Sequence, residues 1–278
     1  MRAIDARHMG NEKVICIWEL DGVLVDPGPQ SSEETLLAAL DGKRPSALLL
    51  THIHFDHAGV TGALVRRWPD LPVYVHERGA PHLAAPERLL KSAARVFGGL
   101  EGLKRTWGEV EPVPERNLHV LKGGETVLGD FRVEYTPGHA SHHVSYLHEP
   151  SATAFVGDVA GERIPPSEYV AAPTPPPDVD VEAWEHSLDV VAGWQPQALA
   201  LTHFGRVDDV GPHLAAIRER LHEVVALAAQ HGPEAFAAGI ADRVERNAGD
   251  VADCYLQATP PEHGYLGLRR YLDKRAQE

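Results

Sequence analysis

The sequence lacks long hydrophobic runs and has few cysteines, and both features narrow the class of protein. No apolar stretch in its 278 residues approaches the ~20 residues of a membrane-spanning helix. The N-terminal stretch MRAIDARHMGNEKVICIWEL carries acidic residues and has no continuous apolar core, unlike a secretory signal peptide. The two cysteines, Cys16 and Cys254, fit a reducing compartment and are expected to be buried small residues rather than a disulfide pair. We therefore expect a cytoplasmic protein that binds no membrane.

Basic residues are also in deficit. The chain has 26 Lys and Arg against 40 Asp and Glu, which gives a formal net charge of −14. A nucleic-acid partner would require a basic face, so this balance disfavours one. A small anionic substrate stays possible, because a bound cation can outweigh the global charge locally. Histidine is the one residue type in excess, with 17 copies.

The order of apolar and amphipathic segments indicates the fold class. Strand-like runs such as VICIW, SALLLT, PVYVH, FRVEYT, TAFVGD and ALALTH alternate with helical patterns. One such helix is SSEETLLAALDG, which has a serine at its start and a glycine after its end. Strand–helix alternation of this kind predicts an α/β protein.

Two segments depart from this alternation. Residues 81–110 read as a helical insertion between two predicted strands, and residues 209–278 contain almost no strand pattern. In the latter, Leu214, Ile217, Leu221 and Val224 mark one face of a helix. We therefore predict a first domain over 1–206, which carries the insertion, and a C-terminal helical region over 207–278.

Four side chains suited to metal binding follow directly after a predicted strand. The stretch SALLLTHIHFDHAG places His52, His54, Asp56 and His57 within six residues. Such groups would repel one another when protonated, whereas a divalent cation makes their proximity favourable. This motif therefore predicts a metal site.

Three further strand ends supply the remaining candidates. His139 follows a Pro-Gly turn in VEYTPGHASHH, Asp158 ends TAFVGD, and His203 ends ALALTH. In an open α/β sheet, ligand-binding residues gather outside the carboxyl ends of the strands. We expect these side chains to meet the first four there.

Together these motifs resemble the metallo-β-lactamase superfamily over about residues 14–206. The resemblance implies an αββα four-layer sandwich and a dinuclear metal site. In this pattern the first metal takes His52, His54 and His139. The second takes Asp56, His57 and His203, and Asp158 bridges both. Asp26, at the end of GVLVD, corresponds to a residue that supports the motif.

The resemblance also implies a hydrolytic mechanism. Two divalent ions lower the pKa of a shared water and supply hydroxide at neutral pH, so no serine or cysteine nucleophile is required. Asp56 is in addition a candidate to relay a proton to the leaving group. Ligation by nitrogen and oxygen suits Zn²⁺ best, with Mn²⁺ or Fe²⁺ as alternatives.

Three further residues are candidates around the metals. His143 falls where many relatives place a supporting histidine. His142 is either a hydrogen-bond donor to the substrate or an exposed residue. Tyr169, in the Pro-rich loop after Asp158, either donates to an oxyanion or packs on the sheet.

The family pattern leaves the reaction open. We expect hydrolysis of an ester, thioester or lactone of a small molecule. A mononuclear iron enzyme resembling the persulfide dioxygenases, with its ion on His52, His54, His139 and Asp158, is the alternative from another class. A phosphodiesterase or nuclease is a further alternative that the acidic balance disfavours.

The insertion and the tail are expected to cover the metals and to contribute to a possible homodimer. The Gly98–Gly99 pair supplies a possible hinge for a lid. The insertion is richer in apolar side chains than a short surface helix requires: Leu89, Leu90, Val96, Phe97 and Trp107. The tail has four cations that either bind an anionic substrate or form a solvated helix face: Arg269, Arg270, Lys274 and Arg275.

Overall fold

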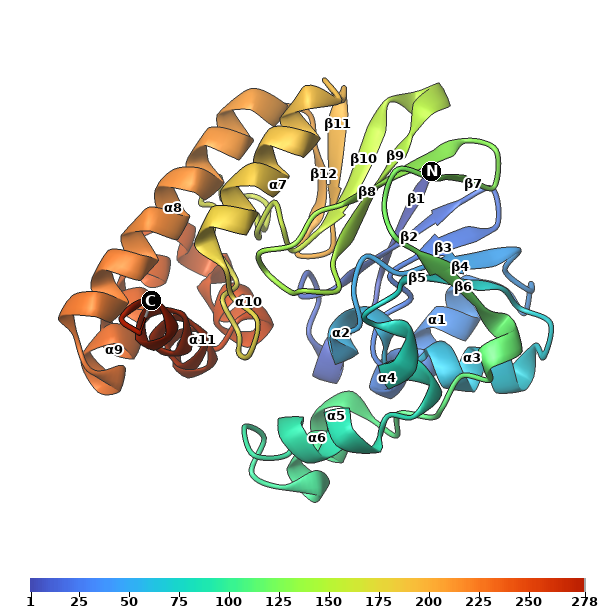
Figure 1. Ribbon diagram of the computed structural model, residues 1–278, viewed down its shortest axis with the longest axis horizontal. Helices are drawn as coiled ribbons and strands as arrows, with labels where there is room; N and C mark the ends of the chain where they lie inside the picture. The colour runs from blue at the N-terminus through green and yellow to red at the C-terminus, as the bar shows by residue number, and fades with distance from the viewer. Residues whose placement is uncertain (278) are drawn as a thin grey trace.

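A computed structural model of the protein describes residues 1–277 and contains two six-stranded sheets that face each other (Figure 1). The first sheet has the order β1 (Arg2–Asp5), β2 (Cys16–Leu20), β3 (Val23–Val25), β4 (Ala47–Leu49), β5 (Val73–His76) and β6 (Leu118–Leu121). The second has the order β12 (Gly205–Val207), β11 (Ala198–Leu201), β10 (Thr153–Gly157), β9 (Val144–His148), β8 (Phe131–Tyr135) and β7 (Thr126–Val127). Both sheets are mixed, with parallel pairing from β3 to β6 and between β10 and β11.

Helices cover the outer faces of both sheets (Figure 1). On the first sheet lie α1 (Glu33–Ala39), α2 (Phe55–Ala58) and α3 (Thr61–Arg67), and on the second lie α7 (Val181–Gly193) and α8 (Val210–Gln230). The remaining α-helices are α4 (Ala80–Ala84), α5 (Glu87–Ala93), α6 (Leu100–Trp107), α9 (Pro233–Ala248), α10 (Ala252–Ala258) and α11 (Pro261–Arg275). Short 3₁₀ turns complete the set: η1 (His8–Gly10), η2 (Gln30–Ser32), η3 (Glu115–Asn117), η4 (Glu149–Ser151) and η5 (Gly249–Val251).

Strand β2 shows how the sequence specifies the layers. Successive side chains of a strand point to opposite faces of the sheet. Cys16, Trp18 and Leu20 accordingly enter the core between the two sheets, whereas Ile17 enters the core beneath the helices of the first sheet. A third core joins the second sheet to α7 and α8. The predicted αββα sandwich is confirmed.

The predicted insertion and tail are both helical. The insertion contains α5 and α6, and its residues Leu89 and Trp107 pack against the core of the first sheet. Strand β12 ends at Val207, so the second sheet continues one residue past the predicted boundary. Helix α8 packs its predicted apolar face on this sheet, whereas α9 to α11 lie beyond it (Figure 1). The division into two domains stays a prediction.

Two other expectations concern the cysteines and the membrane. Cys16 is buried between the sheets and Cys254 is half-buried, and both are free thiols. Among residues 1–277, no helix is both long enough and apolar enough to cross a membrane.

Candidate metal centre

The seven predicted ligands meet where strands of both sheets end. His52 and His54 follow β4, and Asp56 and His57 lie in α2 immediately after them. His139 follows β8, Asp158 follows β10, and His203 lies between β11 and β12. They form two groups, in each of which the ligand atoms lie within 4.8 Å of one another. The groups are His52, His54, His139 and Asp158, and Asp56, His57, Asp158 and His203, so Asp158 belongs to both.

Glycines permit two of these ligands to reach the centre. Gly157 has a φ of +46°, and a Cβ there would lie 2.4 Å from the Thr51 hydroxyl oxygen. Gly138 has a φ of +132°, and its Cβ would lie 2.3 Å from the Cα of Trp184. Only glycine fits such backbone without strain. The glycines that precede Asp158 and His139 are therefore required by the close approach of the chain at the centre.

Hydrogen bonds fix which nitrogens of the first group carry protons. His139 donates from Nδ1 to the carbonyl oxygen of Pro173 at 2.9 Å, so its Nε2 carries a lone pair. Thr51 Oγ1 donates to Asp26, and His52 Nδ1 lies 3.1 Å from the same hydroxyl, so His52 donates to it and also keeps a lone pair on Nε2. Both Nε2 atoms then lie 3.0 Å from Nδ1 of His54.

Three imidazole nitrogens thus converge with at most one proton to share among them. Burial, followed by the neighbouring imidazoles, holds the pKa of His52 well below its usual value. Burial and His139 together lower the pKa of His54 to about 4. The three histidines of the first group are therefore neutral at physiological pH, and their lone pairs are available to a cation.

The second group combines two histidines with two carboxylates. His203 donates from Nδ1 to the carbonyl oxygen of Val14 at 2.7 Å, which turns its Nε2 toward Asp56 Oδ2 at 3.3 Å. His57 Nε2 lies 3.2 Å from Asp158 Oδ1. Both of these atoms, His57 Nε2 and Asp158 Oδ1, are buried and lack a hydrogen-bond partner among the described residues.

These orphaned atoms test whether a metal fits. A buried polar atom without a partner is costly, and a cation at this point would accept electron pairs from both atoms. Nitrogen and oxygen donors in two groups with a shared carboxylate suit divalent ions such as Zn²⁺, Mn²⁺ or Fe²⁺. The residues of the centre therefore fit divalent metal ions.

Asp26 holds the second group in place from behind. It is buried, and its Oδ2 accepts hydrogen bonds from the hydroxyls of Thr51 at 2.7 Å and Thr202 at 3.1 Å. The same oxygen lies 2.8 Å from His57 Nδ1. A carboxylate on the far nitrogen of a metal-ligating histidine fixes its tautomer and orientation. Asp26 thus lies directly behind His57, and its supporting role stays a prediction.

We expect Asp26→Asn to keep most of the bound metal while lowering turnover by roughly 10–100-fold, as loss of an outer hydrogen bond to a ligand does. Asparagine is the appropriate replacement because Asp26 has a φ of +49°, which asparagine tolerates and alanine does not. Elemental analysis and steady-state kinetics check the result. Asp70→Ala, at an exposed carboxylate, serves as the control. Unchanged kinetics in Asp26→Asn would contradict this role.

The two groups also differ in the protons that they hold without metal. Although burial lowers the pKa of His203, the carboxylates of Asp158 and Asp56 raise it to about 9. The pKa of His57 is likewise raised well above its usual value, against burial, by Asp158, Asp56 and Asp26. In the metal-free protein the second group therefore binds protons at neutral pH, whereas the first group does not.

We accordingly expect the second metal equivalent to bind more tightly as pH rises from neutral to about 9, the pKa of His203. A proton must leave the nitrogen before a cation takes its lone pair, and this cost falls until the pH passes the pKa. The first equivalent should show little pH dependence above the pKa of His54, about 4. Calorimetric titration of metal-free protein in buffers of different ionisation enthalpy measures the released protons. Equal proton release for both equivalents would contradict the asymmetry.

The two histidines after His139 also lie at the centre. His143 is buried, its Nδ1 lies 2.9 Å from the hydroxyl of Thr136, and its ring centroid lies 5.1 Å from that of His52. The ring of His142 lies 5.6 Å from that of His54 and is 9% exposed. His143 therefore packs behind the ligands, whereas His142 lies beside His54, which is itself only partly buried.

Tyr169 lies in a different environment. It packs in a cluster with Ile164, Val244 and Tyr255, and the guanidinium of Arg220 lies 4.8 Å from the centre of its ring. Tyr169 is interpreted from the sequence either as a donor to an oxyanion or as a packed residue, and this position agrees with packing. Its ring packs against the C-terminal helices rather than on the sheet. These contacts could not be predicted from the sequence, because Arg220 and Tyr255 lie far from Tyr169 along the chain.

The tail cations mostly have partners on the protein itself. Arg269 donates to Asp273 at 2.9 Å on the same helix, and Arg275 pairs with Glu182 of α7. Arg270 and Lys274 are exposed. This arrangement agrees with a solvated helix face and gives no support to an anion site.

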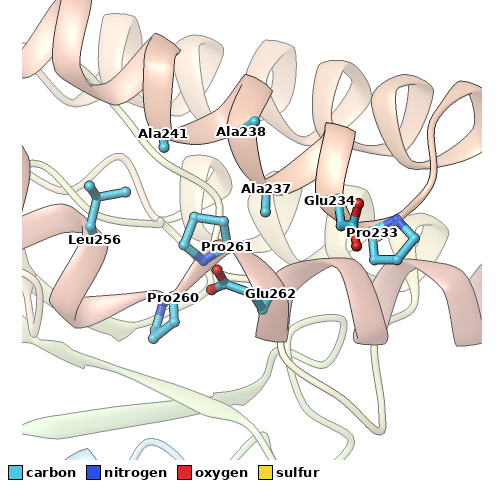
Figure 2. A pocket seen from close by; sticks show the side chains of 9 residues that line it. All are labelled: Pro233, Glu234, Ala237, Ala238, Ala241, Leu256, Pro260, Pro261 and Glu262. Carbon is cyan, nitrogen blue, oxygen red and sulfur yellow. The ribbon is translucent and has the colours of Figure 1, made fainter.

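A hollow of about 580 Å³ lies elsewhere, between α9 and the start of α11. Figure 2 shows the alanines of α9 opposite the prolines that begin α11. The polar side chains among its nine lining residues are the carboxylates of Glu234 and Glu262. Its lining contains no histidine and no cationic side chain, so this hollow lacks the nitrogen ligands that the histidine–aspartate centre offers to a metal.

The sequence interpretation missed residues that lie beside this centre. Thr51 and Thr202 supply hydroxyls to Asp26. The third residue that the sequence interpretation missed is His8, whose imidazole interacts electrostatically with Asp56 and His203. A threonine after a strand and a lone histidine in a polar stretch are common, so no sequence signal distinguishes them.

Comparison with known proteins gives a consistent result. The family model described as the metallo-beta-lactamase superfamily matches residues 19–203. The metallo-beta-lactamase fold-containing protein ST1585 of Sulfurisphaera tokodaii is 30% identical over 194 residues, which span 66% of this chain and 69% of that protein. The crystal structure of ST1585 superposes with a TM-score of 0.71 at 25% identity and covers 96% of this chain and 97% of that one.

Two other relatives are named as hydrolases. The probable metallo-hydrolase YqgX of Bacillus subtilis is 32% identical over 140 residues, or 49% of this chain and 60% of that protein. A hydroxyacylglutathione hydrolase of Hamiltonella defensa is 38% identical over 92 residues, or 32% of this chain and 36% of that protein. The chain thus spans less than two thirds of the length of either relative.

Proposed function

The chain belongs to the metallo-β-lactamase superfamily, and we propose that it is a metal-dependent hydrolase that cleaves an ester, thioester or lactone bond of a small molecule. One observation carries the proposal: two groups of nitrogen and oxygen donors share the buried carboxylate of Asp158. This arrangement favours a dinuclear hydrolase over the mononuclear iron alternative, because a single iron on the first group would leave the second set of donors, Asp56, His57 and His203, without a metal to bind.

The residues of the centre would divide between the two metals. His52, His54 and His139 would hold the first, and Asp56, His57 and His203 the second, with Asp158 between them. Two such ions would make water nucleophilic near neutral pH, polarise the scissile carbonyl and stabilise the leaving group.

The side chains around the ions have their own tasks. Asp56 is the carboxylate with more access to solvent, since its side chain is 15% exposed against 4% for Asp158. Although burial raises the pKa of Asp56, His57 and His203 hold it below its usual value, so the group is an anion at neutral pH. We assign it the transfer of a proton from water to the leaving group. Asp26 keeps His57 in the tautomer whose Nε2 faces inward.

The choice of a carboxylic substrate rests on charge and on one relative. The net charge of −14 disfavours polyanionic nucleic acids. The name hydroxyacylglutathione hydrolase describes the cleavage of an acylated glutathione by a relative of this chain. A cytoplasmic location, a small-molecule substrate and a homodimer complete the proposal.

The test is a panel of carboxylic esters, acyl thioesters and lactones, with a phosphodiester and a persulfide as the competing substrates. We expect the highest kcat/KM on a carboxylic substrate, with activity rising through an apparent pKa of about 7 and then levelling off. Cleavage of the phosphodiester alone, or oxygen uptake with the persulfide, would replace the proposal with the corresponding alternative.

A further inference from the structure

A buried histidine at the N-terminus interacts electrostatically with the metal centre without being one of its seven predicted ligands. His8, in η1, is 2% exposed, whereas its neighbour Met9 is 60% exposed. The flanking residues Arg7 and Met9 have φ values of 48° and 53°, in the left-handed region that non-glycine residues seldom occupy. Strained backbone of this kind persists where the surrounding structure holds it, and it is concentrated at functional sites. Here it turns the His8 ring inward.

Contacts with the tail hold this turn in place. The carbonyl oxygen of His8 accepts a hydrogen bond from Gln257 Nε2 of α10 at 3.1 Å. Asn11 donates to the same side chain at 2.6 Å. The N-terminal segment is therefore fixed to the C-terminal helices.

The ring of His8 stacks on the ring of Trp107, at the end of α6. Their centroids lie 4.7 Å apart and their planes are inclined by 6°. Nδ1 of His8 and Nε1 of Trp107 are both buried, and neither has a hydrogen-bond partner among the described side chains and backbone. An unsatisfied buried polar group is costly, and each such group calls for an explanation such as an unseen ligand.

Hydrogen bonds through η2 connect the end of α6, which carries Trp107, to the metal motif. Glu109 donates its backbone N–H to Gln30 Oε1 at 2.8 Å, and Ser31 Oγ donates to the carbonyl oxygen of Thr106 at 3.0 Å. Two residues before Gln30, Gly28 donates its N–H to the carbonyl oxygen of His57 at 3.0 Å. The end of α6 is thus held close to the second donor group.

The electrostatic environment of His8 agrees with this position. Burial lowers the pKa of His8, while Asp56 raises it and His203 lowers it. The imidazole is therefore neutral at physiological pH and can donate one hydrogen bond. The nearby carboxylate of Asp56 disfavours an anionic group at this position, so a neutral acceptor is the better match.

We propose that His8 and Trp107 form a substrate subsite beside the second donor group, which binds a neutral carbonyl oxygen, such as that of an amide, in the leaving group of the substrate. The proposal rests on the proposed ester, thioester or lactone hydrolysis and names a substrate class within it. The indole N–H and the imidazole donate to the carbonyl, and the stacked rings contact the chain that bears it.

Two substrates of similar length test this subsite. The butanoyl thioester of N-acetylcysteamine has an amide in its leaving group, whereas S-pentyl thiobutanoate has only methylenes there. Wild-type protein should prefer the amide by about tenfold in kcat/KM, the effect of one net hydrogen bond. Trp107→Phe and His8→Phe keep the rings and remove the donors, and each should reduce this preference severalfold with unchanged metal content.

Further variants separate binding from structure. His8→Asn, which retains a donor near the position of Nδ1, should restore part of the preference, and the control Met9→Ala should retain all of it. If the ring variants lower turnover of both thioesters equally, His8 and Trp107 are only structural. An unchanged preference would mean that water alone satisfies the two nitrogens, and either result overturns the proposal.

A binding measurement distinguishes failure of the subsite from failure of the hydrolase proposal. In the zinc-loaded protein, the Nε1–H resonance of Trp107, identified by its loss in Trp107→Phe, should shift when N-propylacetamide is added. The shift should shrink in His8→Phe. A shift without thioester turnover would leave the subsite standing and contradict the proposed function. Thioester turnover without a shift and without an amide preference would contradict the subsite and leave the proposed hydrolase function standing.

Discussion

Asp158→Ala is expected to lose both metals and to lower turnover by about 10³-fold or more, because the cations are what makes water nucleophilic at neutral pH. Among residues 1–277, Asp158 is the only one that belongs to both donor groups. Its side chain lies 3.2 Å from His57 Nε2 and 3.3 Å from His139 Nε2. Removing it therefore takes one ligand from each group and also removes the negative charge that the two groups share.

Elemental analysis together with turnover checks this expectation. Asp208→Ala is the matched control, because Asp208 is an exposed carboxylate soon after His203 in the chain and pairs with Arg206 instead. The control should keep its metal and its activity. Full metal occupancy in Asp158→Ala would refute the assignment of Asp158 as the shared ligand.

Complete removal of metal from the wild-type protein is expected to abolish hydrolysis, and Zn²⁺ or Mn²⁺ should restore it. The reason is the lack of a suitable protein nucleophile among the thiols. Cys16 is buried between the sheets, and burial raises the pKa of its thiol to about 12. Burial also raises the pKa of Cys254, which is only half-buried.

Dialysis against a chelator, followed by readdition of each ion, measures this dependence. Alkylation of the thiols serves as the control and should leave turnover intact. Hydrolysis that survives complete metal removal would rule out the mechanism. Loss of activity on alkylation, with both metals still bound, would show that a cysteine takes part.

The parts of the fold and site that the sequence predicted are those encoded locally. Alternation in β2 sends Cys16 and Trp18 to one face and Ile17 to the other, so one strand already indicates a sheet with cores on both sides. The motif from His52 to His57 spans a single strand end and the first turn of α2. Its members are neighbours in space because they are neighbours in sequence.

The other ligands were predicted because strand ends of an α/β protein gather at one edge. The sequence could not indicate which nitrogen of each histidine faces inward. That choice depends on Val14 and Pro173, whose carbonyl oxygens anchor His203 and His139 from distant parts of the chain.

Residues with tertiary roles were beyond sequence reasoning. Tyr169 shares its loop with the predicted ligand Asp158, yet Arg220 and Tyr255 of the tail decide where its ring packs. His8 stands 44 positions before His52 in the sequence. The backbone at Arg7 and Met9 turns its ring inward, and α10 holds the turn. Neither contact leaves a pattern in the residues themselves.

The count of metal ions per chain tests the central claim most directly. Protein purified without added metal should contain close to two divalent ions per chain, one for each donor group, as measured by elemental analysis against a quantitative protein assay. Zinc or manganese at that ratio would agree with the dinuclear hydrolase. A single iron per chain, or a preparation that hydrolyses its substrate with no metal at all, would contradict it.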